Sequence, residues 1–306
     1  MGNEITNTRE RVAEQLPISN AILAIHSLDL SVLQTQSTMS QSLWPKGAKA
    51  AVSITLDNVG ESRAVGVGEW SESKPIGEDP SVLEVTPRIL DILDKHGVLV
   101  TYFMEAWGMQ TYQDLLLAFQ TRGHEIGFHA YQHEEWKSLN PDQEKEILNK
   151  SLAVARELGV QYKGFRPPGG SLNGGTKDLL RSHGFKYASK LGETVVVDDD
   201  GFVGLPFKWR AVDAFYILDL FDFLRVEYGE QPFVFSAEDF QNAMIKQIDA
   251  AVNNGEYLDL LFHPFLYASP EYAAAFDVTV AYVRDNEDIW CAPLHEVADW
   301  ISARSR

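Results

Sequence analysis

Apolar and polar residues alternate with two different periods along most of the chain, and each change of period marks a new element. Short apolar runs predict strands, and apolar residues three and four positions apart predict helices. The predicted strands are 50–56, 98–103, 125–128, 162–165, 186–189 and 257–262. The predicted helices are 80–96, 112–121, 141–158, 176–183, 237–253 and 294–302. Strand and helix follow each other repeatedly, which indicates parallel strands joined by crossover helices.

The alternation begins only near residue 47, so the pattern divides the chain of 306 residues into two parts. Residues 1–46 read as an N-terminal extension, with one amphipathic helix at 9–24 and a stretch rich in Ser, Thr and Gln at 31–42. Residues 47–306 read as one α/β domain. Its length suits a closed or nearly closed barrel better than an open sheet.

Composition and charge narrow the class of protein. The sum of 26 basic and 44 acidic residues is −18, which repels phosphate backbones, so we expect no nucleic-acid partner. Apolar runs are too short for a membrane span, and the polar N-terminus does not resemble a signal peptide. The single cysteine, Cys291, excludes a disulfide within one chain. We therefore expect a cytoplasmic protein with no membrane partner.

Titratable side chains gather where the predicted strands end. The strand ends carry 57–58, 104–107, 129–133, 166–170 and 263–264. Since parallel strands of a barrel bring their carboxyl ends to one rim, these groups are expected to meet there.

The spacing of His129 and His133 is compatible with a metal site. On a helical turn, two histidines four residues apart share a face and bind one ion, with a carboxylate as the usual third ligand. The alternative is a pair of surface or capping histidines. The position directly after a strand favours the metal.

Three further residues suggest acid–base chemistry. Asp57 follows a buried strand and needs a partner, for which Arg166 is suited because its guanidinium can hold a carboxylate through two hydrogen bonds. The pair is either a structural ion pair or an oriented general base. His263, between Phe262 and Pro264, is either a packed core histidine or a general acid facing Asp57.

In their order, these residues carry a resemblance to the polysaccharide deacetylase family, also called nodulation-type deacetylases or carbohydrate esterase family 4. The resemblance covers about residues 44–300 and includes the branch that contains peptidoglycan deacetylase-like and allantoinase-like proteins. The matching segments are Thr55-Leu56-Asp57-Asn58, Gly123–His129 with His133, Arg166-Pro167-Pro168 and Leu260–His263.

The resemblance implies a distorted (β/α)7 barrel and metal-assisted hydrolysis of an amide C–N bond. It implies that Asp57 is the base, that His263 is the acid and that Arg166 orients the base. The metal, expected to be zinc, would be held by Asn58, His129 and His133.

One residue departs from the family pattern, because Asn58 replaces a metal-binding aspartate. An amide oxygen binds zinc more weakly than a carboxylate does. Asp57 could then be the third ligand, Glu61 could reach in from the loop, or no metal could bind. The first two outcomes leave a metallo-deacetylase. The third leaves a metal-independent cyclic amide or imide hydrolase of the allantoinase type, or a non-catalytic binding protein.

The remaining expectations concern the substrate and assembly. Residues beside the motifs are expected to contact a small-molecule or sugar amide, and backbone N–H groups near Gly169 to stabilise an oxyanion. These substrate-binding candidates are Glu105, Trp107, Tyr131, Pro168, Gly169 and Phe265. The aromatic segment 209–228 is pocket wall, core or dimer surface. The N-terminal extension suggests a homo-oligomer.

Overall fold

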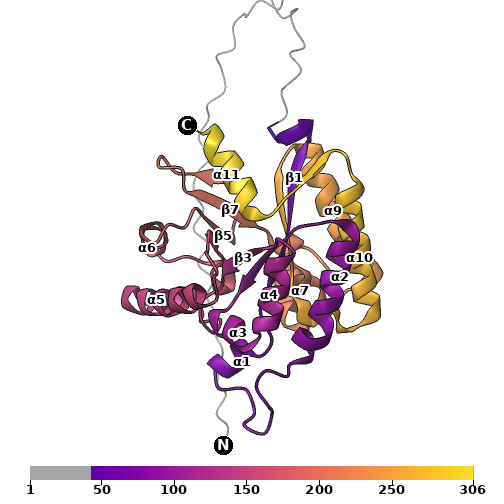
Figure 1. The fold of residues 1–306 in the computed structure, drawn as a ribbon. Coiled ribbons are helices and arrows are strands. Elements are labelled where there is room, and N and C mark those ends of the chain that lie inside the picture. Colours follow the sequence, from indigo (N-terminus) through magenta and orange to yellow (C-terminus); the bar gives the residue numbers. More distant parts are fainter. Residues whose placement is uncertain (1–42, 306) are drawn as a thin grey trace, which may run out of the picture. The chain divides into compact units, whose positions relative to one another are not determined.

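One curled β-sheet organises residues 43–305, the part of the chain that this computed structural model describes (Figure 1). Its strands are β1 (Ala50–Asp57), β2 (Thr101–Met104), β3 (Glu125–Phe128), β4 (Gly164–Phe165), β5 (Tyr187–Leu191), β6 (Val196–Val197), β7 (Val203–Phe207), β8 (Tyr257–Phe262) and β9 (Ile289–Cys291). The predicted helix at 9–24 and most of the extension lie outside the described residues.

The strand order confirms the predicted barrel-type fold. Within the described residues, the path runs β6-β7-β5-β4-β3-β2-β1-β8, and all neighbours on it except β6 and β7 pair in parallel. The two ends of the curl approach each other where Val212, just beyond β7, forms a parallel bridge with Leu261 of β8. The barrel is distorted because β4 has only 2 residues and because the hairpin strand β6 precedes β7 in place of a crossover helix.

β1 is the central strand, and all 8 of its residues are buried. On one side it pairs with β8 along most of its length. On the other side, β9 pairs with Ala50–Val52, while β2 pairs with Thr55–Asp57. Because β9 occupies the first half of this edge, β2 begins at Thr101, three residues later than the apolar run at 98–103 predicts.

Helices cover the outside of the sheet. Figure 1 shows α2, α9 and α10 side by side along one flank, where α10 packs against both other helices. The α-helices are α1 (Ser62–Gly66), α2 (Thr86–His96), α3 (Ala106–Thr111), α4 (Gln113–Thr121), α5 (Pro141–Glu157), α6 (Thr176–Ser182), α7 (Asp213–Ile217), α8 (Asp222–Glu227), α9 (Ala237–Asn254), α10 (Pro270–Asp285) and α11 (Leu294–Arg304).

Local signals in the sequence set several helix ends. The Asn140 side chain accepts from two backbone N–H groups of α5, and Gln143 reaches back to the N–H of Asn140, which completes a capping box. Gly97 ends α2 in the left-handed conformation that glycine adopts without strain. The predicted helix at 80–96 is divided, since its first turn, Ser81–Val85, is a π-helix that leads into α2.

Short single-turn helices complete the chain between the main elements. They are Pro45–Gly47, Trp136–Ser138, Pro168–Gly170, Trp209–Ala211, Asp219–Phe221 and Pro264–Ala268. The sequence pattern missed β7, β9 and α10, along with the small helices at 106–111 and 213–227. Among residues 43–305, no helix combines the length and apolar character needed to cross a membrane.

Candidate active site

The carboxyl ends of the parallel strands surround a pocket of about 430 Å³. Asp57 enters it from the end of β1, and His129 and His133 enter from the loop after β3. Arg166 follows β4, and His263 follows β8. The five residues that the sequence placed at one rim therefore do line a common pocket.

Asp57 and Arg166 form the ion pair that the sequence predicts. The guanidinium donates to Asp57 Oδ1 at 2.7 Å, and both side chains are buried. Asp57 Oδ2 lies 3.9 Å from Nε2 of His129. One carboxylate oxygen is thus fixed by the guanidinium, while the second faces the histidine.

Arg166 also binds a second buried carboxylate, Asp259 of β8. Its other terminal nitrogen donates to Asp259 Oδ2, and Thr55 donates to Asp259 Oδ1 at 2.8 Å. Ser189 accepts from the guanidinium at 2.9 Å. Burial raises the pKa of Asp259, although the charge of Arg166 opposes that rise. One guanidinium is therefore shared by two carboxyl groups and held rigidly.

The sheet makes room for the guanidinium at Gly127. A Cβ at this position would come within 2.4 Å of the Phe103 ring. The Phe103 ring in turn lies 4.3 Å from the Arg166 guanidinium, a cation–π contact. Glycine at residue 127 therefore allows the ring to pack where it supports Arg166.

His129 and His133 meet through a tight turn and not through the helical turn that their spacing suggests. Residues 129–135 are not helical, and Ala130 and His133 have φ values of 65° and 66°. This left-handed conformation is costly for residues other than glycine, and such strain gathers at functional sites. It brings the two imidazole rings to a centroid distance of 5.0 Å.

Both imidazoles are prepared to act as neutral ligands. His129 Nδ1 lies 2.8 Å from the Arg166 carbonyl oxygen and donates to it, which leaves the Nε2 lone pair free to bind. Burial lowers the pKa of His129 to about 3 and that of His133 to about 3. Both rings are therefore neutral at neutral pH.

Glu105 supplies a carboxylate that the sequence assigned to substrate binding. It is fully buried, and it accepts hydrogen bonds at 2.8 Å from the Asn58 side chain and from the N–H of Val59. Burial raises its pKa to about 8. It is not among the residues that line the pocket, and it lies beside His129 and His133, so it is a candidate metal ligand and not a substrate contact.

Glu105, His129 and His133 together fit a divalent ion. One ligand atom from each lies within 4.8 Å of the others. Two neutral imidazoles and a carboxylate form a typical catalytic zinc donor set. A cation would also compensate the buried carboxylate, which otherwise retains a proton. Asn58 lies beside this cluster, but its amide donates to Glu105, so the third ligand comes from β2 and not from β1.

Glu61 does not reach into the site, which contradicts one alternative from the sequence. Its two carboxylate oxygens accept from the Tyr112 hydroxyl and from the N–H of Gly77, the latter at 2.7 Å. It therefore holds the loop after α1 in place.

His263 is oriented by Asp213, a residue that the sequence analysis did not single out. Asp213 accepts at 2.6 Å from both Nδ1 and the backbone N–H of His263, and at 3.0 Å from the Tyr267 hydroxyl. Burial lowers the pKa of His263, but the Asp213 carboxylate outweighs burial, so this pKa lies above 6.5. Nε2 is thereby left as the proton-carrying atom toward the pocket.

The structure places only some of the predicted substrate-binding residues at the pocket. Gly169 and Phe265 line the pocket, whereas Trp107, Tyr131 and Pro168 do not. Tyr131 instead packs under Lys150, whose ammonium lies 3.4 Å from the ring centroid. Trp107, Tyr131 and Pro168 are therefore next to the motifs in sequence but are not part of the pocket lining.

The sequence pattern did not identify two buried carboxylates, although the sequence around one of them could have indicated that it needs a partner. Asp259 stands in the apolar run YLDLLF, and a charged residue inside a buried strand requires a partner. Asp213 lies in a segment with no clear period, so its approach to His263, 50 residues later, could not be read from the pattern.

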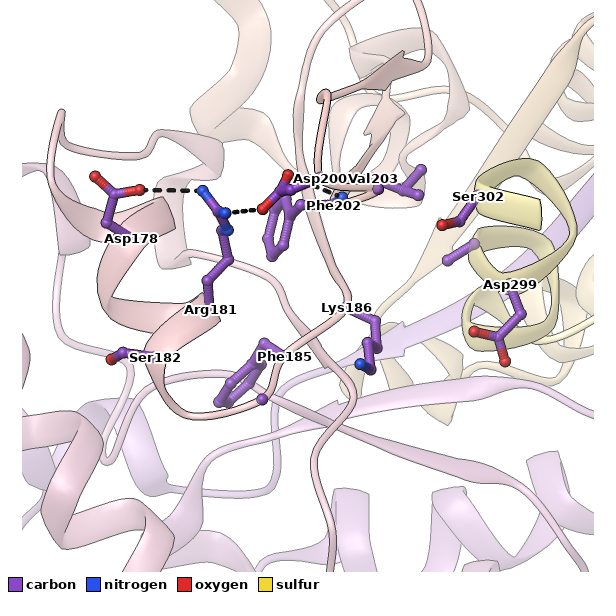
Figure 2. Close-up of a pocket in the computed structure, with 13 residues that line it drawn as sticks. Asp178, Arg181, Ser182, Phe185, Lys186, Asp200, Phe202, Val203, Asp299 and Ser302 are labelled. Atoms are coloured by element: carbon purple, nitrogen blue, oxygen red, sulfur yellow. Dashed lines mark hydrogen bonds and ion pairs between the residues drawn. The ribbon is translucent and has the colours of Figure 1, made fainter. Parts of the chain in front are cut away.

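A larger cavity, of about 630 Å³, lies near the amino ends of β5 and β7 (Figure 2). In Figure 2, Arg181 extends toward Asp178 and Asp200, with which it forms ion pairs. None of the motif residues line this cavity. The cavity at the carboxyl ends is therefore the candidate active site.

Comparisons with known proteins relate the chain to polysaccharide deacetylases. A family model described as polysaccharide deacetylase matches residues 76–188. The peptidoglycan deacetylase of Helicobacter pylori is 23% identical over 246 residues, covering 70% of this chain and 82% of that protein. For further curated relatives the match spans 16% to 39% of their length.

Solved structures show the same fold. A structure from Mycobacterium smegmatis assigned to the polysaccharide deacetylases has a TM-score of 0.74 at 27% identity, over 86% of this chain and 93% of that chain. The PuuE allantoinase structure has a TM-score of 0.67 at 20% identity, over 87% and 95%.

Fold and site together define a barrel hydrolase with a rim of histidines and carboxylates. The chain resembles the polysaccharide deacetylase family in sequence and fold. This resemblance supports a deacetylase-like hydrolase of amide C–N bonds.

Proposed function

We propose that the chain is a metal-dependent C–N hydrolase in which Glu105, His129 and His133 hold one divalent ion, most naturally zinc. The observation that carries the proposal is their convergence within 4.8 Å beside Asp57. A divalent ion at these ligands would supply Lewis-acid polarisation of the amide carbonyl oxygen. The departure at Asn58 is then compensated by a carboxylate from the next strand.

Asp57 acts as general base. Its Oδ1 is fixed by Arg166, so Oδ2 is the oxygen that takes a proton from an attacking water. The water oxygen bonds to the carbonyl carbon as that proton leaves. Arg166 keeps the carboxylate oriented through this hydrogen bond.

His263 acts as general acid. Its Nδ1 is held by Asp213, which keeps the proton on Nε2 and stabilises the charged ring. As the C–N bond breaks, Nε2 gives its proton to the leaving nitrogen. Asp57 and His263 therefore move protons in opposite directions, and the free carboxylic acid and amine are the products.

A kinetic comparison tests these roles. Asp57→Ala and His263→Ala should each lower kcat for amine release from an acetamide by at least about 100-fold, the usual contribution of one acid or base. His183→Ala, at an exposed histidine directly after α6, is the control and should retain full activity. Wild-type turnover in both active-site variants would contradict the assignment.

Metal-independent hydrolysis of a cyclic amide remains the second candidate, supported by the similarity to the fold of the allantoinase. A cyclic ureide or imide has a more electrophilic carbonyl and needs less Lewis-acid help. Undiminished turnover of such a substrate after chelation would favour it. Cytoplasmic location and assembly as a homo-oligomer stay predictions.

A further inference from the structure

Many residues that line the pocket are apolar, and most of these come from one segment that runs from the end of β7 toward β8. They form an apolar wall of Phe207, Trp209, Val212, Ala214, Leu218, Leu220 and Phe221. Leu261 and Phe265 extend it toward His263. The wall is therefore independent of the motif residues.

Aromatic packing gives this wall a fixed shape. The rings of Phe207 and Trp209 meet edge to face at 6.3 Å, and Trp209 lies 5.3 Å from Phe221. Leu220 is 65% exposed and stands at the mouth. The cavity thus has a rigid apolar side and an apolar entrance.

Hydrogen-bonding groups for a sugar are scarce. Among the described residues that line the pocket, there is no Ser, Thr, Gln or Tyr. The polar lining residues belong to the catalytic and metal cluster, apart from Arg63, which is half-exposed. A glycan would have to give up hydrogen bonds to water for its hydroxyls without replacement, which disfavours its binding.

We infer that the substrate is an amide or imide whose non-reacting part is an aryl or branched alkyl group, and that the wall discriminates against glycans. The inference rests on the proposed C–N hydrolase function and names its substrate class. A cavity of about 430 Å³ accommodates one ring with a short chain. Leu220 and Phe221 are the specificity-determining residues.

Two acetamides with the same scissile bond test the inference: N-benzylacetamide and N-acetylglucosamine. Binding is measured by calorimetry, and hydrolysis by amine release, on the metal-loaded wild-type protein. We expect kcat/KM for the benzyl compound to exceed that for the sugar by at least about 10-fold, the discrimination available from one apolar contact.

Variants of two wall residues, with one control, test whether the apolar wall determines this preference. Leu220→Gln should weaken binding of N-benzylacetamide by about 3- to 10-fold, and Phe221→Ala by more, in line with lost apolar contact. Leu117→Gln, at a leucine on α4 that is 56% exposed, is the control and should change nothing.

The outcomes separate this inference from the proposed function. Binding of the benzyl compound without turnover of either probe would contradict the function and support the substrate class. Preferred hydrolysis of the sugar would support the function and overturn the substrate class. Failure to bind the benzyl compound, or an equal loss in Leu117→Gln and Leu220→Gln, would also overturn it.

Discussion

Asn58 shows how one residue changes the electrostatics of the metal cluster. Its amide donates to Glu105, a carboxyl group whose pKa burial raises to about 8. The backbone at Asn58 is left-handed, with φ of 70°, which asparagine tolerates better than most residues. Asparagine therefore serves here as a donor to the carboxylate from β2.

Asn58→Asp should make the metal-free protein sensitive to alkaline pH. Glu105 already retains a proton in the folded wild type at neutral pH, and a second buried carboxyl group beside it further disfavours ionisation. The folded variant therefore retains more protons than folded wild type after the unfolded chain has released them. Its free energy of unfolding should thus fall, relative to wild type, as pH rises from 6 to 9. Thermal unfolding in chelator measures the difference. Asn140→Asp, at an exposed cap, is the control, and parallel curves for Asn58→Asp and wild type would contradict the model.

Asp213→Asn should remove the charge that raises the pKa of His263. A raised pKa in the folded protein contributes stability that is fully present below the unfolded value near 6.5 and is lost as pH rises through the folded value. The stability difference between wild type and variant should therefore narrow with rising pH. The alkaline limb of kcat should move to lower pH, because an acid of lower pKa loses its proton earlier.

His263 can be followed directly by NMR titration in both proteins. The imidazole should titrate at lower pH in Asp213→Asn than in wild type. Identical titration curves would show that Asp213 does not set the charge of the ring.

At the scale of single residues, the motifs predicted well which side chains lie at the rim. They predicted less well which chemical role each side chain has. Asp57, His129, Arg166 and His263 could be placed at the rim because each directly follows an apolar run. The role of Glu105 could not be predicted, because it depends on the register between β1 and β2, which brings Asn58 against it.

At the scale of elements, the loop after β3 depends on a buried polar network behind it. Asn173 donates to the carbonyl groups of Trp136 and Leu139 and to Glu144, at 2.7–3.1 Å. Glu144 also accepts from Thr176 at 2.7 Å. The start of α5 and the segment after β4 thereby fix the loop that carries His133.

Asn173→Ala should increase local opening of this loop more than it lowers the free energy of unfolding of the whole protein. Loss of its hydrogen bonds leaves buried acceptors unpaired, at a cost of about 1–3 kcal/mol. We expect faster hydrogen exchange over residues 129–139 and weaker binding of zinc, by about 10- to 100-fold, as for other supporting residues of metal sites.

Asn140→Ala provides the comparison, because it perturbs α5 at its own N-cap. It removes an exposed cap and should cost about 1 kcal/mol without affecting zinc binding. Equal losses of zinc affinity in the two variants would mean that Asn173 acts only through the stability of α5.

Strong periodicity made most elements predictable. β3 and β8 match the predicted limits, and α5 begins at its expected cap. β7 was missed because Gly204 and Pro206 interrupt its five residues. α10 was missed because β-branched residues dilute its helical pattern.

At the scale of the whole molecule, Arg166 links strands from both halves of the sheet. It contacts Asp57 of β1, Asp259 of β8 and Ser189 of β5. The sequence predicted a closed or nearly closed barrel. It did not predict that a buried ionic cluster around Arg166 would fill part of the barrel interior. That arrangement depends on side chains that only the closed sheet brings together.

Arg166→Met should destabilise the fold by about 3–5 kcal/mol, because two buried carboxyl groups lose their cation. Arg122→Met removes the partly exposed pair with Asp94 and should cost about 0–1 kcal/mol. Urea unfolding at pH 7 compares the two variants. A cost for Arg166→Met no greater than that of the surface control would contradict the cluster.

Metal content tests the central claim most directly. Plasma mass spectrometry would be applied to wild type, Glu105→Gln and Glu61→Gln after equilibration with zinc and removal of unbound ion. We expect about one equivalent of zinc in wild type and in Glu61→Gln, whose carboxylate supports a loop. Glu105→Gln should retain little or none, because a ligand is lost. No zinc in wild type, or full retention in Glu105→Gln, would contradict the proposed metal centre.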